Sequence, residues 1–267
     1  MVTSWVYSRT WAAGSIMHAG RTNGRSTDVH KTRKVIFPAA GGRPLLEGML
    51  HVPDGPGPFP AAVVCHPHPL MGGTMDNAIV VAVCHVLAAR GWAALRFNFR
   101  GAGASEGHFD EGRGELNDVA GAVTFLRARA KLHLNQVAVV GYSFGAGVGL
   151  RHAARDRHVG WLVGIALVQE HYEDPFLDAD TRSKLFIVGE RDPWAPAEAL
   201  REYVARLSPP KTLHILPHTD HFFAGCEAEV ATSIGKWLNA APQRTRDQRP
   251  RTAGFCRIQA ESRWGEK

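Results

Sequence analysis

The chain has 267 residues, of which 45% are hydrophobic, so it is long enough for one large domain or two small ones with a sizeable core. It has no run of about 18 apolar residues and no apolar signal segment after Met1, which argues against a transmembrane or secreted protein and predicts a cytoplasmic one. The cysteines have neither zinc-ligand nor disulfide-framework spacing, so reduced thiols are expected at Cys65, Cys84, Cys226 and Cys256.

The basic charge lies in the two ends of the chain. The net charge is +6, of which residues 1–34 carry +5 and residues 242–267 carry +4, leaving −3 for residues 35–241. The central part therefore lacks the basic face that binding to a nucleic acid requires, and no nucleic-acid partner is expected.

Neither end has hydrophobic periodicity, so each is interpreted as an extension of a domain at residues 35–241. The first extension is rich in Ser, Thr and Arg, as a transit peptide is, but a disordered leader, or a start at Met17 rather than Met1, would look the same.

Short apolar runs alternate with helical patterns from residue 35 onward. The segments KVIFPA and PLLEGMLHVP flank Gly41-Gly42-Arg43, which predicts a β-hairpin. A strand at 61–65 precedes a helix that begins after Asp76 or Asn77 and ends at Gly91, and WAALRFNF is the next strand. One buried helix face is then predicted by spacings of three and four between Leu116, Val119, Val123, Leu126 and Ala130.

The second half continues the alternation. A strand at 137–141 precedes a helix over 145–155, and the strands VGWLVGIALV, KLFIVG and TLHIL follow, with a helix from Pro196 and a last one through Val230, Ile234 and Leu238. This order predicts the α/β class: a mainly parallel sheet with helices on both faces. Ligands of such sheets bind beyond the carboxyl ends of the strands.

The stretch Gly141-Tyr142-Ser143-Phe144-Gly145 lies where the strand VAVV turns into a helix. A serine in such a turn is exposed at the ligand-binding edge, and the flanking glycines avoid the collisions that a Cβ would cause. We therefore predict that Ser143 is a nucleophile. The alternative is a helix entry in which Ser143 is only the N-cap.

A serine nucleophile needs a base, and the base needs an acid to orient it. In this architecture they follow later strands, in the order acid then histidine. Asp192 follows the strand ending near Gly189 and is preferred to Glu190 as the acid. His221 follows the next strand and is preferred as the base to His218, in the same loop, and to His214, within the strand.

Stabilisation of an oxyanion needs two backbone N–H groups. The first is expected from Phe144, the residue after the nucleophile. The second is expected from the loop VVCHPHPLMGGTMDN, where Pro67 and Pro69 have no N–H, so His68 is the first candidate and Leu70 the second.

Four motifs, CHPHPLMGGTMDN, FNFRGAGASEG, GYSFGA and HTDHFF, resemble those of the α/β-hydrolase superfamily, within it the small, lidless, dienelactone-hydrolase-like hydrolases. The resemblance covers roughly residues 35–240 and implies Ser143, Asp192 and His221 as the triad, with no cofactor. Dienelactone hydrolase carries a cysteine in its elbow, so Ser143 argues against dienelactone as the substrate.

Only about a dozen residues, QEHYEDPFLDAD, lie where a lid would be inserted, so no lid domain is expected. An open site suits small or short-chain esters, and the expected function is a serine carboxylesterase that acts on a small molecule. A peptidase or amidase with the same triad, and a non-catalytic scaffold, remain alternatives, and the oligomeric state is left open. Six residues are predicted to line the pocket: Leu70, Tyr142, His171, Tyr172, Trp194 and Phe222.

Four histidines could instead be metal ligands, namely His66, His68, His218 and His221. Binuclear zinc hydrolases carry such residues in one contiguous HxHxDH motif, whereas here the two pairs are some 150 residues apart. A complete serine constellation also competes for the same residues. No metal site is therefore predicted, and zinc is kept as the minority alternative.

Overall fold

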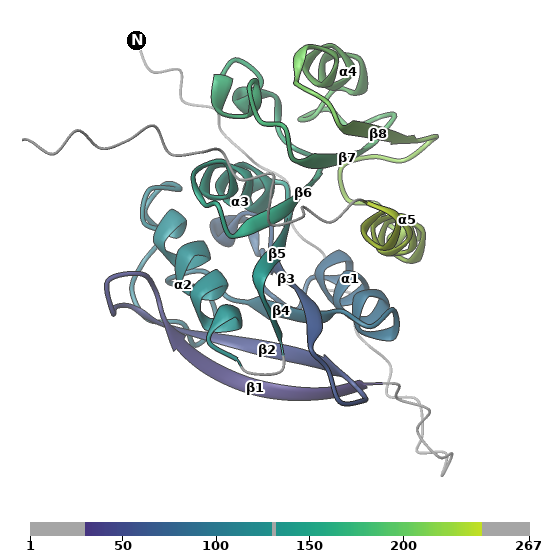
Figure 1. The fold of residues 1–267 in the computed structure, drawn as a ribbon. Coiled ribbons are helices and arrows are strands. Elements are labelled where there is room, and N and C mark those ends of the chain that lie inside the picture. The colour runs from purple at the N-terminus through teal and green to yellow at the C-terminus, as the bar shows by residue number, and fades with distance from the viewer. Residues whose placement is uncertain (1–29, 130–131, 242–267) are drawn as a thin grey trace, which may run out of the picture.

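A computed structural model describes residues 30–129 and 132–241 (Figure 1). Its eight strands form one sheet in the order β1-β2-β4-β3-β5-β6-β7-β8. Their bounds are β1 (His30–Pro38), β2 (Leu45–Pro53), β3 (Phe59–Cys65), β4 (Ala93–Phe97), β5 (Leu132–Tyr142), β6 (Val159–Ile165), β7 (Ser183–Gly189) and β8 (Lys211–Leu216).

The sheet has an antiparallel edge and a parallel body. β2 is antiparallel to both β1 and β4, and all the other neighbouring strands are parallel. The central strands are buried along nearly their whole length, as their unbroken Val, Ile, Leu and Ala runs predict for strands covered on both faces. The predicted α/β class is confirmed.

Five α-helices cover the sheet: α1 (Ala78–Ala89), α2 (Glu115–Arg127), α3 (Phe144–Arg155), α4 (Ala197–Arg206) and α5 (Glu227–Ala240). In Figure 1, α1 and α5 lie together on one face and α2 and α3 on the other. Asn77, one of the two predicted caps of α1, accepts a hydrogen bond from the Ile79 N–H. The predicted helix residue Ala130 lies outside the described residues.

No lid covers the sheet between β6 and β7. Residues 166–182 contain only two 3₁₀ turns, η2 (Gln169–His171) and η3 (Pro175–Leu177), as the sequence predicted. The carboxyl ends of the parallel strands are therefore not capped by an inserted domain.

The sheet begins earlier than predicted. β1 starts at His30, whereas the sequence placed the start of the domain at residue 35. Residues 31–34 are exposed and three of them are basic, so they show no apolar pattern, but their backbone pairs with β2 throughout. Residues 1–29 and the predicted basic tail at 242–267 lie outside the described residues.

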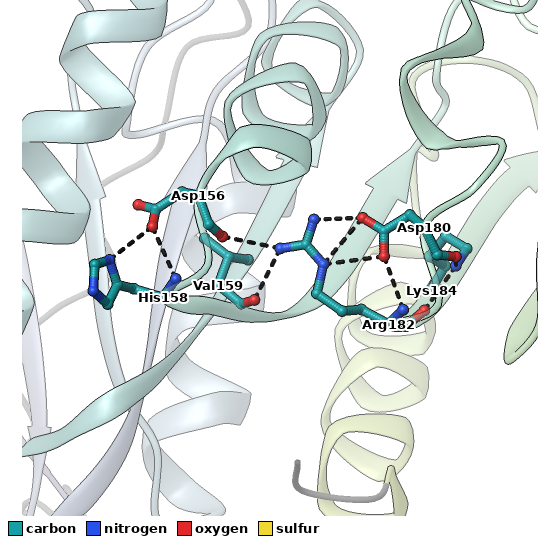
Figure 2. A network of polar contacts seen from close by, with 6 residues as sticks. All are labelled: Asp156, His158, Val159, Asp180, Arg182 and Lys184. Carbon is teal, nitrogen blue, oxygen red and sulfur yellow. Dashed lines mark hydrogen bonds and ion pairs between the residues drawn. The ribbon is translucent and has the colours of Figure 1, made fainter. Parts of the chain in front are cut away.

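A buried polar network joins β6 and β7 at their amino ends, away from the loops that follow the strands (Figure 2). Arg182, only 7% exposed, donates to the carbonyls of Asp156 and Val159, both at 3.0 Å, and pairs with the Asp180 carboxylate. The fully buried Lys184 donates to the Arg182 carbonyl at 2.7 Å. The guanidinium thus binds a carbonyl of β6, a carbonyl just before β6 and a carboxylate just before β7.

Replacing Arg182 with Gln should lower the free energy of unfolding by about 2–4 kcal/mol, because the acceptors would stay buried without their donor. Urea denaturation measures the change. Arg201→Gln is the matched control: Arg201 pairs with Glu198 at the surface, so its loss should cost under about 0.5 kcal/mol. Equal losses in the two variants would contradict the role given to Arg182.

Candidate active site

Ser143 lies in a strained turn between β5 and α3. Its φ is +55° and its ψ −119°, a conformation that residues with a side chain rarely adopt and that costs on the order of 1–3 kcal/mol. A Cβ on Gly141 would lie 2.2 Å from the Gly145 carbonyl oxygen, and one on Gly145 would lie 2.5 Å from the His66 carbonyl oxygen. Both glycines are therefore required for the turn to close against β3.

Three side chains from three separate loops form a line of hydrogen bonds. His221 Nε2 lies 2.9 Å from Ser143 Oγ, and His221 Nδ1 lies 2.7 Å from Asp192 Oδ2. All three residues are buried, with at most 8% of their surface exposed. The structure thus brings together the three residues that the sequence predicted as nucleophile, base and acid.

The loops after β7 and β8 hold the acid and the base. Asp192 Oδ1 accepts from the N–H groups of Trp194 and Ala195 at 2.9 and 2.8 Å, which leaves Oδ2 for the imidazole. The hydroxyl of Tyr142 donates to the carbonyl of His221 at 2.8 Å, and the fully buried Phe223 anchors the same loop. The imidazole is therefore held by a hydrogen bond to its ring from Asp192 and by a hydrogen bond to its own backbone carbonyl from Tyr142.

The alternatives to these three residues lie elsewhere. Ser143 is in the N-cap position of α3, but its side chain makes no cap hydrogen bond. The Glu190 carboxylate accepts from the N–H of His218 at 2.8 Å, and both residues are exposed. His214 lies within β8, opposite Ile187 of β7. None of the three alternative residues contacts Ser143 Oγ.

The two predicted oxyanion donors lie on the two elements that meet at the elbow. Phe144 is the first residue of α3, and His68 is the N-cap of the 3₁₀ turn η1 (Pro69–Met71) that follows β3. Their rings are 5.0 Å apart, and within the described part of the chain neither N–H donates a hydrogen bond. Leu70, the second candidate donor, is the middle residue of η1 and is 71% exposed.

His66 fastens the loop that carries His68. It is fully buried, and its Nδ1 donates to the Pro67 carbonyl at 2.6 Å while its Nε2 accepts from the Phe99 N–H at 3.1 Å. The imidazole must be neutral to accept at Nε2, and burial lowers its pKa to about 4. His66 thus ties the end of β3 to the end of β4.

The predicted pocket residues fall into two groups. Leu70, Trp194 and Phe222 are exposed, and the rings of Trp194 and Phe222 lie 4.9 and 5.9 Å from that of His221. Tyr142 and Tyr172 are only 3% and 4% exposed, so they offer a pocket little surface.

Each buried tyrosine supports the backbone instead, because its hydroxyl donates to a carbonyl: that of His221 for Tyr142 and that of Leu167 for Tyr172. His171 is also buried, and its Nε2 lies 2.0 Å from where a Cβ on Gly147 of α3 would be, so its ring packs against the helix. Burial, and next the charge of Arg151, lower the pKa of His171.

Sequence reasoning missed Phe109 and Met71. The Phe109 ring lies 4.9 Å from that of His68 and 5.6 Å from that of Phe144, and Met71 is 46% exposed in η1 beside Leu70. Phe109 lies in an irregular loop, where no hydrophobic period marks a residue as facing the site.

The four histidines that a binuclear zinc site would need do not converge in the part of the chain that the structure describes. His66 is held in the β3–β4 contact, His218 faces solvent beside Arg191, and His221 bonds Ser143.

Cys65, Cys84 and Cys226 are free thiols; Cys256 lies outside the described residues. No helix among the described residues is long and apolar enough to cross a membrane.

The buried His66 predicts a pH dependence of stability. Its pKa of about 4 in the folded protein lies below the ordinary value of about 6.5, so the unfolded chain takes up the proton first. Stability should therefore fall as the pH drops from about 6.5 towards 4, by up to about 1.4 kcal/mol per pH unit from this group.

Urea denaturation at several pH values measures this slope. His66→Gln, which has no titratable ring, should be less stable at pH 7 and show a shallower loss below pH 6.5. His108→Gln, at an exposed histidine, should retain the wild-type slope. A His66→Gln slope identical to the wild type would contradict the assignment.

Comparisons with known proteins bear on the fold and the chemistry. A family model described as X-Pro dipeptidyl-peptidase (S15 family) matches residues 2–212, which include Ser143 and Asp192. An uncharacterized protein from Rickettsia prowazekii (strain Madrid E) is 30% identical over 187 residues, 67% of this chain and 78% of that protein.

Two solved structures are similar over most of the chain. A putative α/β hydrolase of unknown function from Agrobacterium tumefaciens is 33% identical, with a TM-score of 0.71 over 79% of this chain and 100% of that one. An α/β serine hydrolase without a lid from Xanthomonas campestris is 28% identical, with a TM-score of 0.69 over 80% and 97%.

Proposed function

Because the chain belongs to the X-Pro dipeptidyl-peptidase (S15) family and is an α/β serine hydrolase, we propose that it cleaves small or short-chain carboxylic esters through an acyl-enzyme at Ser143. The observation that carries the proposal is the unbroken line of hydrogen bonds from Ser143 Oγ through His221 to Asp192. A serine hydroxyl held in this way by an oriented imidazole is an activated nucleophile.

In the proposed reaction, Ser143 Oγ attacks the ester carbonyl while its proton passes to His221 Nε2. The Asp192 carboxylate stabilises the imidazolium through Nδ1–H, and the N–H groups of Phe144 and His68 bind the oxyanion. The imidazolium then gives its proton to the leaving alcohol. Water, activated by the same imidazole, attacks the acyl-enzyme and releases the acid and Ser143.

The surroundings of the serine support a small ester as substrate. Four of the five exposed large hydrophobic residues of the described chain lie in loops that flank the triad: Leu70, Met71, Trp194 and Phe222. They offer apolar contacts for an acyl or alcohol group, and the short segment 166–182 supplies no lid to enclose a long chain.

The chemistry needs no metal or organic cofactor. The negative charge of residues 35–241 favours no nucleic-acid partner, and we propose a cytoplasmic location with a small molecule as the only substrate partner.

A panel of p-nitrophenyl esters tests the proposal. The wild type should hydrolyse the acetate and butyrate with higher kcat/KM than the dodecanoate, and Ser143→Ala should lower kcat/KM by several orders of magnitude. Chelators should leave the rate unchanged. Hydrolysis by Ser143→Ala at the wild-type rate would contradict the role of the serine, and a preference for the dodecanoate would contradict the short-chain substrate.

The matched acids and histidines of the two loops give a second test. Asp192→Asn should lower kcat by about 10³–10⁴, because an amide cannot hold the imidazole in the required tautomer. Glu190→Gln, two residues away and exposed, should change kcat less than about twofold.

The bases compare in the same way. His221→Ala should abolish turnover, and His218→Ala, in the same loop but exposed, should preserve it. A larger loss of kcat in Glu190→Gln than in Asp192→Asn would reverse the assignment of the acid. A larger loss in His218→Ala than in His221→Ala would reverse that of the base.

The family description favours a second candidate, a peptidase on the same triad. Release of dipeptides requires an acidic group near the serine to bind the free amino terminus. Glu170 is 3.5 Å from His171, and its charge acts on His68, so it lies near the site. Cleavage of an alanyl-prolyl anilide that Glu170→Gln loses, while p-nitrophenyl acetate cleavage persists, would establish a peptidase activity and the role of Glu170 in binding the amino terminus.

A further inference from the structure

A cluster of three histidines lies on the α1 face of the sheet, formed by His30 of β1, His51 of β2 and His85 of α1. The three rings are mutually in contact, with centroids 5.1–5.3 Å apart. In the antiparallel pairing of β1 and β2, His51 lies opposite Thr32, so His30 and His51 are diagonal neighbours on one face. Among the described residues this is the one group of three or more His, Cys, Asp or Glu side chains close enough to share an ion.

The cluster is far from Ser143. His51 is paired with Ala94 of β4, which is level with Ala62 of β3 and Ala138 of β5. Ser143 lies five residues beyond Ala138, and β2 and β5 are three strand spacings apart, so the separation is on the order of 20 Å. The cluster is therefore a site of its own, near the amino ends of the parallel strands.

The spacing of the nitrogens is that of metal ligands. His51 Nδ1 lies 3.2 Å from His30 Nε2, and one nitrogen from each of the three residues lies within 4.8 Å of the others. Two imidazole nitrogens bound to one tetrahedral Zn²⁺ at about 2.05 Å are about 3.4 Å apart. The first pair thus has the required separation already, and the third ligand needs a shift of up to about 1.5 Å.

The three residues differ in burial in a way that suits an ion. His51 is 1% exposed, and its Nε2 accepts a hydrogen bond from Arg96 Nε at 3.2 Å, which requires a neutral imidazole. His85 is exposed and gives an ion a route from solvent. His30, the third residue, is half-buried and lies at the first position of β1.

Arg96 determines how the cluster responds to an ion. Its Nε donates to His51 Nε2 at 3.2 Å, so the metal-free His51 carries its proton on Nδ1 and donates to His30 Nε2. When an ion binds His51 Nδ1, the imidazole proton must move to Nε2. The Arg96 Nε–H group then loses its acceptor and must move away from the ring. Arg96 keeps its bond to the Met75 carbonyl and its ion pair with Asp76, and that carboxylate offsets its charge.

We propose that His30, His51 and His85 bind one divalent transition-metal ion of the Zn²⁺ class, with water as the fourth ligand. Three neutral imidazoles and a water are a donor set that Zn²⁺ accepts in tetrahedral geometry. The ion joins β1 and β2 to α1, so its effect is on the stability of this edge of the sheet and not on the chemistry at Ser143.

Zn²⁺ titration of the full chain by calorimetry tests the site. The wild type should bind one equivalent of Zn²⁺ at this site with micromolar or tighter affinity. In His85→Ala the affinity of that equivalent should fall at least tenfold. His85 is exposed, so its loss should leave the fold intact, which a cooperative thermal transition checks. His108→Ala, at an exposed histidine outside the cluster, should bind as the wild type does.

Two further readouts distinguish this site from Zn²⁺ held elsewhere on the chain. Zn²⁺ should raise the Tm of the wild type and of His108→Ala but not that of His85→Ala or His51→Gln. Co²⁺ should give the strong visible absorption of a tetrahedral complex only where all three histidines are present. Equal Zn²⁺ binding and equal Tm shifts in the wild type and His85→Ala would overturn the proposal, whatever the outcome of the ester assays.

Discussion

The geometry of the site depends on the strained backbone of Ser143. A residue with a Cβ is held at a φ of +55° because β5 must turn at once into α3, and α3 must start against the end of β3. The glycines at 141 and 145 make this close approach possible. The strain is sustained by the surrounding core, since β5 lies in the middle of the sheet with neighbours on both sides.

The other groups that the proposed reaction needs lie at the same edge of the sheet. The loops after β3, β7 and β8 supply His68, Asp192 and His221, and each loop is fastened by a buried group that takes no part in the chemistry. His66 bonds the β3 loop to β4, Tyr142 bonds the carbonyl of His221, and the backbone N–H groups after Asp192 hold its carboxylate. The side chains of the site are thus positioned by the loops at the ends of strands. Ser143, His221 and Asp192 already form their line of hydrogen bonds without the closure of a mobile element.

The sequence predicted the α/β class and the three members of the line of hydrogen bonds because these leave local signals. Buried parallel strands are continuous apolar runs, and an elbow is a serine between glycines at the end of one. The acid and base were selected by their place just past later strands, which also separated Asp192 from Glu190. His218 and His221 share one loop, and His221 was preferred because Phe222 and Phe223 follow it and can anchor that loop.

The features that the sequence did not reveal depend on contacts between distant parts of the chain. The first residues of β1 are polar and exposed, and only pairing with β2 makes them a strand. Tyr142 and Tyr172 look like pocket aromatics next to the site, but their hydroxyls are bound to carbonyls that only the folded chain brings near. His30, His51 and His85 come from three elements at irregular spacings, so no motif marks their meeting.

The central claim is that Ser143 is chemically activated, and the most direct measurement is intact mass after incubation with a fluorophosphonate. The account predicts a single phosphonate adduct on the wild-type chain, located at Ser143 by peptide mapping, and none on folded Ser143→Ala. A folded wild-type protein that acquires no adduct, or an adduct on another serine, would contradict it.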